Sequence, residues 1–359
     1  MKGGISVRKK NVTVLLWGFG AMGSGMARMI LKKKGFEIVG VCDRNPAIVG
    51  RSIYELLGEP CPAGKDVRVS PDIESLVSSG FCDICLLATD SFTHKAFPKI
   101  KWLVERRINV ISTAEEMTFP QANRPELAAE IDRLAKANGV TVLGTGINPG
   151  MMMDLLVIMM TGVMTDVENI RVARVNSLSP FGETVMEEQG VGLTTEEFAR
   201  KKSAGEIAGH VGFRESVGMM AAALGLDLRH FEQQMSPILT SVDRKSPFGF
   251  AAAGNVCGVD MRSEGIAGDG LKIEMSHPQQ IEPQAGGVQT GDYIDIAGSP
   301  AVHLSIRPEI NGGIGTIAVC VNMIPHVLNA KPGLKTMIDL PVPRAILGDV
   351  RSMIEEDSE

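Results

Sequence analysis

Cysteine and aromatic residues are scarce in this sequence, and long runs of one charge are missing. The 359 residues include six cysteines, and aromatic side chains make up 4% of the chain. Six cysteines spread over this length are too sparse for a secreted disulfide framework, so we expect reduced thiols. The net charge is −6 and no basic run is longer than three residues, which argues against nucleic acid or an anionic membrane as a partner.

The sequence also has little that could serve as a membrane helix. The apolar residues 12–27 follow a basic segment and so resemble a signal peptide, but four glycines interrupt them and no small-residue cleavage site follows. The later run 151–160 contains Asp154, whereas a membrane helix needs about 20 apolar residues. We therefore expect a cytoplasmic protein.

Two of the cysteines, Cys82 and Cys85, have the spacing of a metal or redox motif. They lie within the apolar run 81–88, which is typical of a buried strand. Residues three apart on a strand point to opposite faces, so one ion is not expected to take both sulfurs. The six histidines supply no second pair of ligands, and we expect no metal.

The first 150 residues alternate short apolar runs with helical stretches. The expected strands are residues 12–17, 36–42, 67–69, 82–88, 109–112 and 140–143, and the expected helices are 21–34, 47–57, 71–78, 93–106 and 124–138. Six strands joined by five helices predict an α/β fold with a doubly wound parallel sheet, the Rossmann arrangement.

After residue 150 the pattern changes. We expect helices at 151–164 and 211–224, a long strand at 168–176, and a helix opened by a capping box of Thr194 and Glu197. Short alternating runs at 257–264, 271–275, 293–297 and 302–306 predict a mostly antiparallel sheet, and an apolar helix is expected at 314–329. The length favours two domains. We expect a dinucleotide-binding domain at 1–150, an α+β substrate and oligomerisation domain at 151–310, and a helical segment at 311–359 that returns to the first domain.

Glycines follow the first expected strand with the spacing of a dinucleotide-binding loop. The residues are Gly18, Phe19, Gly20, Ala21, Met22 and Gly23, and they lead into the first expected helix. In such a loop the first glycine permits the turn, the second lets the backbone approach a pyrophosphate, and the third lets the helix lie close to the sheet. Free N–H groups at the helix N-terminus then face the phosphates. A glycine-rich turn without a ligand is the alternative.

The end of the second strand bears on the choice of nucleotide. Asp43 stands 20 residues after Gly23, where a carboxylate accepts hydrogen bonds from the ribose 2′-hydroxyl of NAD. Arg44 could instead hold the 2′-phosphate of NADP, or be an ordinary surface arginine. The cofactor is therefore expected to be NAD or NADP, with NAD favoured.

Small and hydroxylated residues follow the fourth strand, at the carboxyl edge of the sheet where ligands of this fold bind. Ala88, Thr89 and Asp90 suit contact with a nicotinamide ribose. As an alternative, Asp90 or Ser91 caps the helix that follows.

Two adjacent acids, Glu115 and Glu116, follow the fifth strand at the same edge, just after Thr113, which we also expect at the cofactor. One acid could enter the cleft while the other meets solvent or a helix cap. A carboxylate that is partly desolvated in a cleft has a raised pKa and is suited to proton transfer. Two solvated loop acids are the alternative.

The loop 144–150 contains three glycines and Asn148, whose amide could bind a carboxamide. Glycines bring backbone close to a flat ligand. A hinge between domains is the other interpretation, and both could hold.

Five segments together resemble the 2,4-diaminopentanoate dehydrogenase family, which belongs to the dihydrodipicolinate reductase-like oxidoreductases and has relatives among NAD(P)-dependent amine dehydrogenases. The segments are 18–23, 112–116, 144–150, 209–216 and 330–337. The resemblance implies oxidative deamination of 2,4-diaminopentanoate, a small diamino acid, to 2-amino-4-oxopentanoate and ammonia in ornithine degradation. Dihydrodipicolinate reductase activity is not expected, because the adjacent histidines of that enzyme are missing.

The resemblance also implies roles for single residues. A glutamate after the fifth strand is the base in related amine dehydrogenases, and the matching residue is Glu115, with Glu116 as second choice. The implied substrate contacts are Ile147 and Met152 around the carbon chain. The resemblance identifies no partners for the carboxylate and α-ammonium groups, for which we take Asn176, His210 and Arg214 of the second domain as candidates. His210 could equally be part of a helix cap.

Other interpretations stay open at this point. The same scaffold could act on diaminopimelate, another amine or a ketone, or the chain could sense NAD(P) without turnover. We expect a homodimer, because antiparallel second domains often pair.

Overall fold

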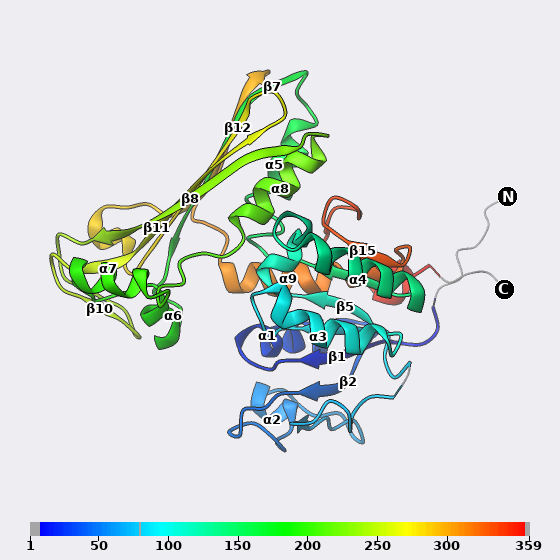
Figure 1. Ribbon diagram of the computed structural model, residues 1–359. Helices are drawn as coiled ribbons and strands as arrows, with labels where there is room; N and C mark the ends of the chain where they lie inside the picture. The colour runs from blue at the N-terminus through cyan, green and yellow to red at the C-terminus, as the bar shows by residue number, and fades with distance from the viewer. Residues whose placement is uncertain (1–7, 79, 356–359) are drawn as a thin grey trace. The chain divides into compact units, whose positions relative to one another are not determined.

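A seven-stranded sheet forms the centre of the first of two units (Figure 1). The structure, a computed structural model, describes residues 8–78 and 80–355. The strands stand in the order β15-β6-β5-β4-β1-β2-β3 and pair in parallel throughout. They are β1 (Val12–Trp17), β2 (Phe36–Cys42), β3 (Val69–Ser70), β4 (Ile84–Leu87), β5 (Asn109–Ser112), β6 (Thr141–Gly144) and β15 (Gly333–Lys335). The order runs outward from β1 in both directions, which confirms the predicted doubly wound sheet.

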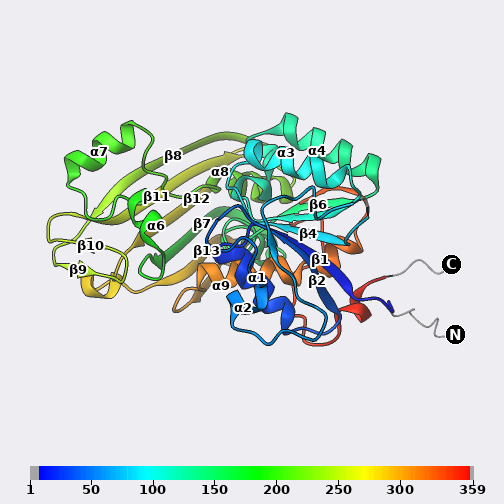
Figure 2. The same cartoon turned by 90° about the horizontal axis from the view of Figure 1, so that it is seen from below.

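Helices cover both faces of this sheet. Figure 2 shows α3 and α4 on one face and α1 and α9 on the other. The helices of the unit are α1 (Ala21–Leu31), α2 (Ile53–Leu57), α3 (Thr93–Val104), α4 (Pro125–Asn138), α9 (Gly312–Asn322) and α10 (Ile324–Leu328), with 3₁₀ turns η1 (Glu115–Thr118), η2 (Pro120–Ala122) and η4 (Val350–Met353). Strand β4 is buried at each of its positions, as expected for a strand covered on both sides.

Two of the helices predicted within residues 1–150 were wrong, one in part and one wholly. Of the helix predicted at 47–57, only α2 exists, because the Asn45 side chain accepts a hydrogen bond from the N–H of Ala47 (3.0 Å) and turns the chain. The helix predicted at 71–78 is absent. There the Asp72 carboxylate accepts hydrogen bonds from the N–H groups two and three residues later (2.9 and 3.2 Å), and such a local turn competes with a helix.

The end of the described chain returns to the first unit. Helix α9 packs against α1, where a Cβ atom on Gly25 would lie 2.2 Å from Cδ1 of Ile317. Strand β15 pairs with β6 and adds a strand that the sequence pattern did not predict. The single helix predicted at 314–329 is wrong, because Met323 separates α9 from α10. Pro325 lies in the first turn of α10, where its missing N–H costs no helical hydrogen bond.

The second unit, residues 152–311, is built on a six-stranded sheet in the order β14-β13-β7-β12-β11-β8. Its strands are β7 (Asp166–Ser177), β8 (Leu228–Leu239), β11 (Val256–Ala267), β12 (Leu271–Gln280), β13 (Gly291–Ser299) and β14 (Val302–Ile306), with a small ribbon of β9 (Arg244–Lys245) and β10 (Phe250–Ala251) beside them. Strands β7 and β12 pair in parallel, and the other pairs in this sheet are antiparallel. The prediction of a mostly antiparallel second sheet is therefore confirmed.

The helices of the second unit are α5 (Leu155–Thr161), α6 (Glu183–Glu188), α7 (Thr195–Ser203) and α8 (Phe213–Ala223). Helix α5 is shorter than the predicted 151–164, because Asp154 caps it by accepting a hydrogen bond from the N–H of Leu155 (2.7 Å). The same buried carboxylate accepts a hydrogen bond from the Ser216 hydroxyl (2.9 Å) and so ties α5 to α8. The predicted capping box of Thr194 and Glu197 is present at the start of α7.

A buried ion pair holds the segment that leads out of the second unit. Arg174 on β7 pairs with Asp292 on β13, and both side chains are almost fully buried. Arg174 also donates to the carbonyl oxygen of Ile310, and Asp292 accepts a hydrogen bond from the N–H of Ile310 (2.9 Å). The chain is thus fixed to the sheet just before residue 312.

The cysteines at 82 and 85 are buried free thiols. Burial raises the pKa of Cys82 to about 12 and raises the pKa of Cys85 well above its usual range. A buried protonated thiol is a poor metal ligand. Within residues 8–78 and 80–355, no three His, Cys, Asp or Glu side chains gather as a metal site. No helix in that part of the chain is long and apolar enough to cross a membrane.

Candidate active site

The glycine-rich loop between β1 and α1 has the geometry of a phosphate-binding turn. Gly18 has a φ of +95°, and a Cβ atom there would lie 2.4 Å from the carbonyl oxygen of Ala88. A Cβ atom on Gly23 would lie 1.9 Å from the carbonyl oxygen of Gly18. By contrast, nothing lies within 4 Å of a Cβ atom placed on Gly20, the N-cap of α1. The backbone is therefore open at the helix N-terminus, where a pyrophosphate would sit.

Asp43, at the end of β2, lies against this loop. Its Oδ2 accepts a hydrogen bond from the N–H of Phe19 (2.6 Å), and its Oδ1 accepts one from the N–H of Asn45 (2.8 Å). Arg44 beside it is exposed. The Asp43 carboxylate is thus held where the adenosine ribose of a dinucleotide would bind, and the exposed side chain of Arg44 follows it in the sequence.

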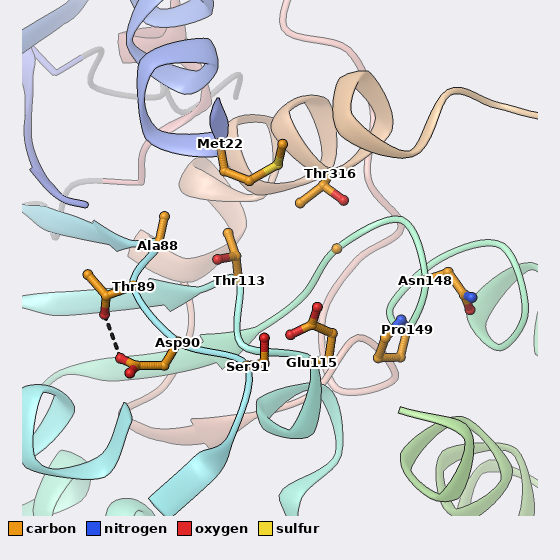
Figure 3. Close-up of a pocket in the computed structure, with 11 residues that line it drawn as sticks. Met22, Ala88, Thr89, Asp90, Ser91, Thr113, Glu115, Asn148, Pro149 and Thr316 are labelled. Atoms are coloured by element: carbon orange, nitrogen blue, oxygen red, sulfur yellow. Dashed lines mark hydrogen bonds between the residues drawn. The ribbon is translucent and has the colours of Figure 1, made fainter. Parts of the chain in front are cut away.

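A cavity of about 320 Å³ opens at the carboxyl edge of the sheet (Figure 3). Its walls come from α1, from the loops after β4, β5 and β6, and from α9. The lining residues are Met22, Ala88, Thr89, Asp90, Ser91, Thr113, Glu115, Gly146, Asn148, Pro149 and Thr316. The structure thus brings together seven residues that were predicted for the site from the sequence: Met22, Ala88, Thr89, Asp90, Thr113, Glu115 and Asn148.

Two carboxylates line the cavity, those of Asp90 and Glu115. Figure 3 shows the Ser91 side chain next to that of Glu115. Burial raises the pKa of Glu115. Hydrogen bonds from its own backbone N–H and from the Ser91 hydroxyl oppose this rise, and the neighbouring charge of Glu116 adds to it. The result is a carboxylate that holds a proton more readily than an exposed glutamate, as proton transfer near neutral pH requires.

Glu116 has a different environment. It is buried and does not line the cavity. Its carboxylate accepts hydrogen bonds from the N–H of Thr93 (2.8 Å) and from the side-chain amide of Asn123 (3.0 Å). One of the two adjacent acids therefore faces the cavity, and the other holds the start of α3.

Asp90 is held in place by a lysine that the sequence pattern did not single out. Lys99 on α3 donates hydrogen bonds to Asp90 Oδ2 (2.6 Å) and to the Thr89 hydroxyl (2.8 Å), and Thr89 donates to the same Asp90 oxygen (2.6 Å). The alternative that Asp90 or Ser91 caps α3 is wrong. The N-cap of α3 is Phe92, whose side chain makes no capping hydrogen bond.

The loop after β6 packs closely on its surroundings. A Cβ atom on Gly144 would lie 2.1 Å from the carbonyl oxygen of Met117, so only glycine fits there. Ile147 is buried, donates its N–H to the Thr316 hydroxyl (3.2 Å), and packs against Gly315. Thr316 itself lines the cavity. No local sequence signal could have found Thr316, because it stands 169 residues after Ile147 and still farther from most of the lining.

The remaining predicted substrate residues lie in the second unit. Asn176 Oδ1 and His277 Nε2 are 2.9 Å apart, and the rings of His210 and His277 meet edge to face with centroids 4.6 Å apart. The structure thus brings Asn176 and His210 together through His277. Burial, with a smaller contribution from Arg174, lowers the pKa of His210 to about 3, so its ring is neutral at neutral pH.

Met152 and Arg214 are the other two residues predicted to contact the substrate. Met152 is buried at the start of the second unit. Arg214 is exposed, with its guanidinium over the ring of Phe231 at 5.5 Å. The sequence reasoning missed His277 because it ended the strand at residue 275, whereas β12 continues to Gln280 and His277 takes the next buried position. If the alternation of buried and exposed positions is followed beyond residue 275, it predicts that His277 is buried.

Comparisons with known proteins agree with this architecture. Residues 151–356 match the sequence model of the 2,4-diaminopentanoate dehydrogenase C-terminal domain. The chain is 58% identical to 2,4-diaminopentanoate dehydrogenase of Acetoanaerobium sticklandii, over 98% of this chain and 99% of that protein. The solved structure of an amine dehydrogenase from Mycobacterium smegmatis superposes with a TM-score of 0.83 at 27% identity, covering 94% of this chain and 98% of the other. A myo-inositol dehydrogenase structure from Lactobacillus casei, with NAD(H) and myo-inositol, shares the fold at 13% identity, with a TM-score of 0.53 and coverage of 96% and 92%.

Proposed function

The chain belongs to the 2,4-diaminopentanoate dehydrogenase family, and from this membership we propose that it catalyses the NAD(P)-dependent oxidative deamination of 2,4-diaminopentanoate to 2-amino-4-oxopentanoate and ammonia. One structural observation carries the proposal. Glu115, a partly buried carboxylate with a raised pKa, lines a cavity that it shares with Met22 of the glycine-loop helix. The candidate proton acceptor and the glycine-rich turn therefore lie at the same edge of the sheet, which supports the proposal.

The residues of this chain fit a nicotinamide nucleotide. The open space at Gly20 would admit the pyrophosphate, and Asp43 would bind the adenosine ribose. Asn148 and Thr113 in the cavity offer an amide and a hydroxyl to a carboxamide and a ribose. The nucleotide, when bound, supplies the two-electron oxidant for C4 of the substrate.

The reaction needs a base, because C4 is a poor hydride donor while the nitrogen attached to it carries an extra proton. We assign this role to Glu115, which would take the proton from the C4 ammonium group. Glu115 then releases this proton to solvent. After C4 is oxidised, water adds to the C4=N double bond, the deprotonated Glu115 accepts one proton of that water and passes it to the nitrogen. The C4–N bond then breaks and ammonia leaves. In total, the ammonium form of the substrate, water and oxidised nucleotide give the ketone, ammonium, reduced nucleotide and one proton.

The rest of the site is proposed in supporting roles. Ile147 and Met152 would contact the carbon chain of the substrate, while Asn176, His210 and Arg214 are the candidates for its carboxylate and α-ammonium groups. A neutral His210 could donate a hydrogen bond to a carboxylate without adding a charge. Glu116 has the weaker claim to the role of base, since its carboxylate accepts hydrogen bonds from the N–H of Thr93 and the side-chain amide of Asn123.

Finer points belong to the same proposal. We favour NAD over NADP, because the Asp43 carboxylate would repel a 2′-phosphate. Ornithine degradation is the setting that the family resemblance implies, and the cytoplasm and a homodimer are the location and assembly we expect.

The experiment that tests the proposal is a spectrophotometric assay for NADH or NADPH formation. The purified chain is offered 2,4-diaminopentanoate, ornithine, diaminopimelate and short amines, each with both nucleotides. We expect reduction with 2,4-diaminopentanoate at a kcat/KM above that of each other compound. If none of the amines reduces either nucleotide while the nucleotides still bind, the chain is a sensor and the proposal is refuted.

A further inference from the structure

A second cavity, of about 500 Å³, lies in the first unit and shares no lining residue with the candidate active site. Its walls are formed by α10, by the residues around β15, by the segment that follows β15, and by residues 352–355. The segment 330–337, which helped to identify the family, runs through this wall. The function proposed above gives that segment no role.

Three cationic side chains line this cavity. They are Lys331, two residues before β15, Lys335, the last residue of β15, and Arg344. None of the three forms an ion pair with any residue of the described chain, although nineteen other such pairs occur there. Two acids, Asp339 and Glu355, also line the cavity, so its lining has three cations against two carboxylates. Asp339 accepts hydrogen bonds from the backbone N–H and hydroxyl of Thr336 (both 2.8 Å). A site with three unpaired cations in a chain of net charge −6 is suited to an anion.

A buried histidine adds an independent observation. His326 on α10 lines the cavity and is 6% exposed. Its Nε2 is buried and has no hydrogen-bond partner in the part of the chain that the structure describes. Burial lowers the pKa of this ring, and the charge of Arg344 lowers it further, so the ring is neutral. Buried polar atoms are nearly always paired in folded proteins, and a ligand atom would supply the missing partner.

Most of the remaining lining is apolar, apart from Asn329 and Ser352. Leu340, Pro341 and Met353 contribute side chains to the walls. The opposite wall is held in place by Asn329, whose amide donates to the carbonyl oxygen of Met353 (2.8 Å) and accepts from the N–H of Glu355 (3.0 Å). The cavity thus combines fixed walls, an apolar surface and a cationic edge, and its volume exceeds what a bare inorganic ion needs.

We propose that this cavity is a binding site for a small organic anion with an apolar body. Its carboxylate or phosphate group is held by Lys331, Lys335 and Arg344, and one of its polar atoms pairs with His326 Nε2. Its apolar part lies against Leu340 and Pro341. The site is separate from the proposed active site and does not depend on the proposed reaction.

The test is calorimetric titration of the full chain with succinate, inorganic phosphate and phenyl phosphate. We compare the wild type with K335Q/R344Q and with K10Q/K245Q, which removes the same charge from two exposed lysines that line neither cavity. We expect K335Q/R344Q to raise the Kd of the bound anion at least about tenfold, and K10Q/K245Q to leave it unchanged. Both double variants change exposed or half-exposed side chains, so normal thermal unfolding is the expected control result.

The same titration separates the sources of the anion. Tighter binding of succinate indicates a carboxylate ligand, and tighter binding of either phosphate indicates a phosphorylated one. Phenyl phosphate should bind more tightly than inorganic phosphate, because its ring can cover the apolar wall. Absence of binding by all three anions, or equal affinity in the two double variants, overturns the proposal. Equal affinity for the two phosphates overturns its apolar part.

Discussion

Glu116 accepts a hydrogen bond of 2.8 Å from the backbone N–H of Thr93, and this bond joins the turn after β5 to the first residue of α3. The preceding residue, Glu115, lines the candidate active-site cavity instead. Two consecutive acids therefore have different surroundings. Substitutions at the two positions should change different properties of the protein.

Replacement of Glu115 by Gln should abolish most of the turnover and leave the nucleotide affinity nearly unchanged. The amide occupies the same space but accepts no proton, so we expect kcat to fall by about 10²–10⁴-fold. Steady-state assays with 2,4-diaminopentanoate and a fluorescence titration with NADH measure the two effects. Wild-type turnover in E115Q would remove Glu115 from the mechanism.

Replacement of Glu116 by Ala should act on stability. The buried N–H of Thr93 and the amide of Asn123 both lose their acceptor, which costs about 1–3 kcal/mol of the free energy of unfolding. Thermal unfolding of E116A beside that of E115Q measures the difference, and we expect E115Q to unfold close to the wild type. An E116A protein with unchanged stability and a kcat as low as that of E115Q would reverse the assignment of the two acids.

Replacement of Ser91 by Ala should move the pH profile of kcat. The Ser91 hydroxyl stabilises the charged form of Glu115 and so lowers its pKa, whereas burial raises it. Without the hydroxyl the pKa rises further, and the acidic limb of the profile should shift to higher pH. The measurement is kcat against pH for S91A and for S203A, whose hydroxyl bonds within α7. A shift to lower pH in S91A would contradict the proposed contact.

The glycine loop offers a test that separates folding from nucleotide binding. G20A adds a methyl group in open space, so the fold should be retained, with only the cost of alanine at the N-cap of α1, about 1 kcal/mol. That methyl group would obstruct the approach of a pyrophosphate, and the Kd for NADH should rise. G23A forces a methyl group to within 1.9 Å of the Gly18 carbonyl oxygen and should lower the melting temperature. A G20A protein that binds NADH like the wild type would place the pyrophosphate elsewhere.

Asp43 and Arg44 should change the cofactor preference in opposite directions. D43N keeps an oxygen that can accept the hydrogen bond of Phe19 but removes the charge that repels a 2′-phosphate. We expect the ratio of kcat/KM for NADP over NAD to rise about tenfold in D43N and to fall in R44Q. Equal ratios in the two variants and the wild type would show that neither residue reads the ribose.

Most of the first unit could be predicted from the sequence, because its strands are short apolar runs bounded by turn residues, a pattern typical of buried parallel strands. The sequence pattern did not predict β15. Three residues, Gly333–Lys335, carry too little pattern to identify a strand, and only the exposed edge of β6 makes them one. The failed helix at 71–78 has the opposite cause, since a local side-chain turn overrode an ordinary helical composition.

The candidate site was predictable where it follows a general rule and was not where it depends on distant packing. The rule that ligands bind at the carboxyl edge of a parallel sheet identified Thr89, Glu115 and Asn148. The rule does not say which of two adjacent acids faces the cavity. That choice depends on Thr93 and Asn123, which supply the hydrogen-bond donors for Glu116.

The pairing of β15 with β6 has a consequence for how the protein is made. A ribosome synthesises β6 nearly two hundred residues before β15, so the first sheet emerges with one edge uncovered while the whole second unit is still being translated. An uncovered edge can recruit strands from other nascent chains. A gene fragment that stops at residue 150 should therefore aggregate when expressed alone, and co-expression of residues 312–359 should rescue its solubility.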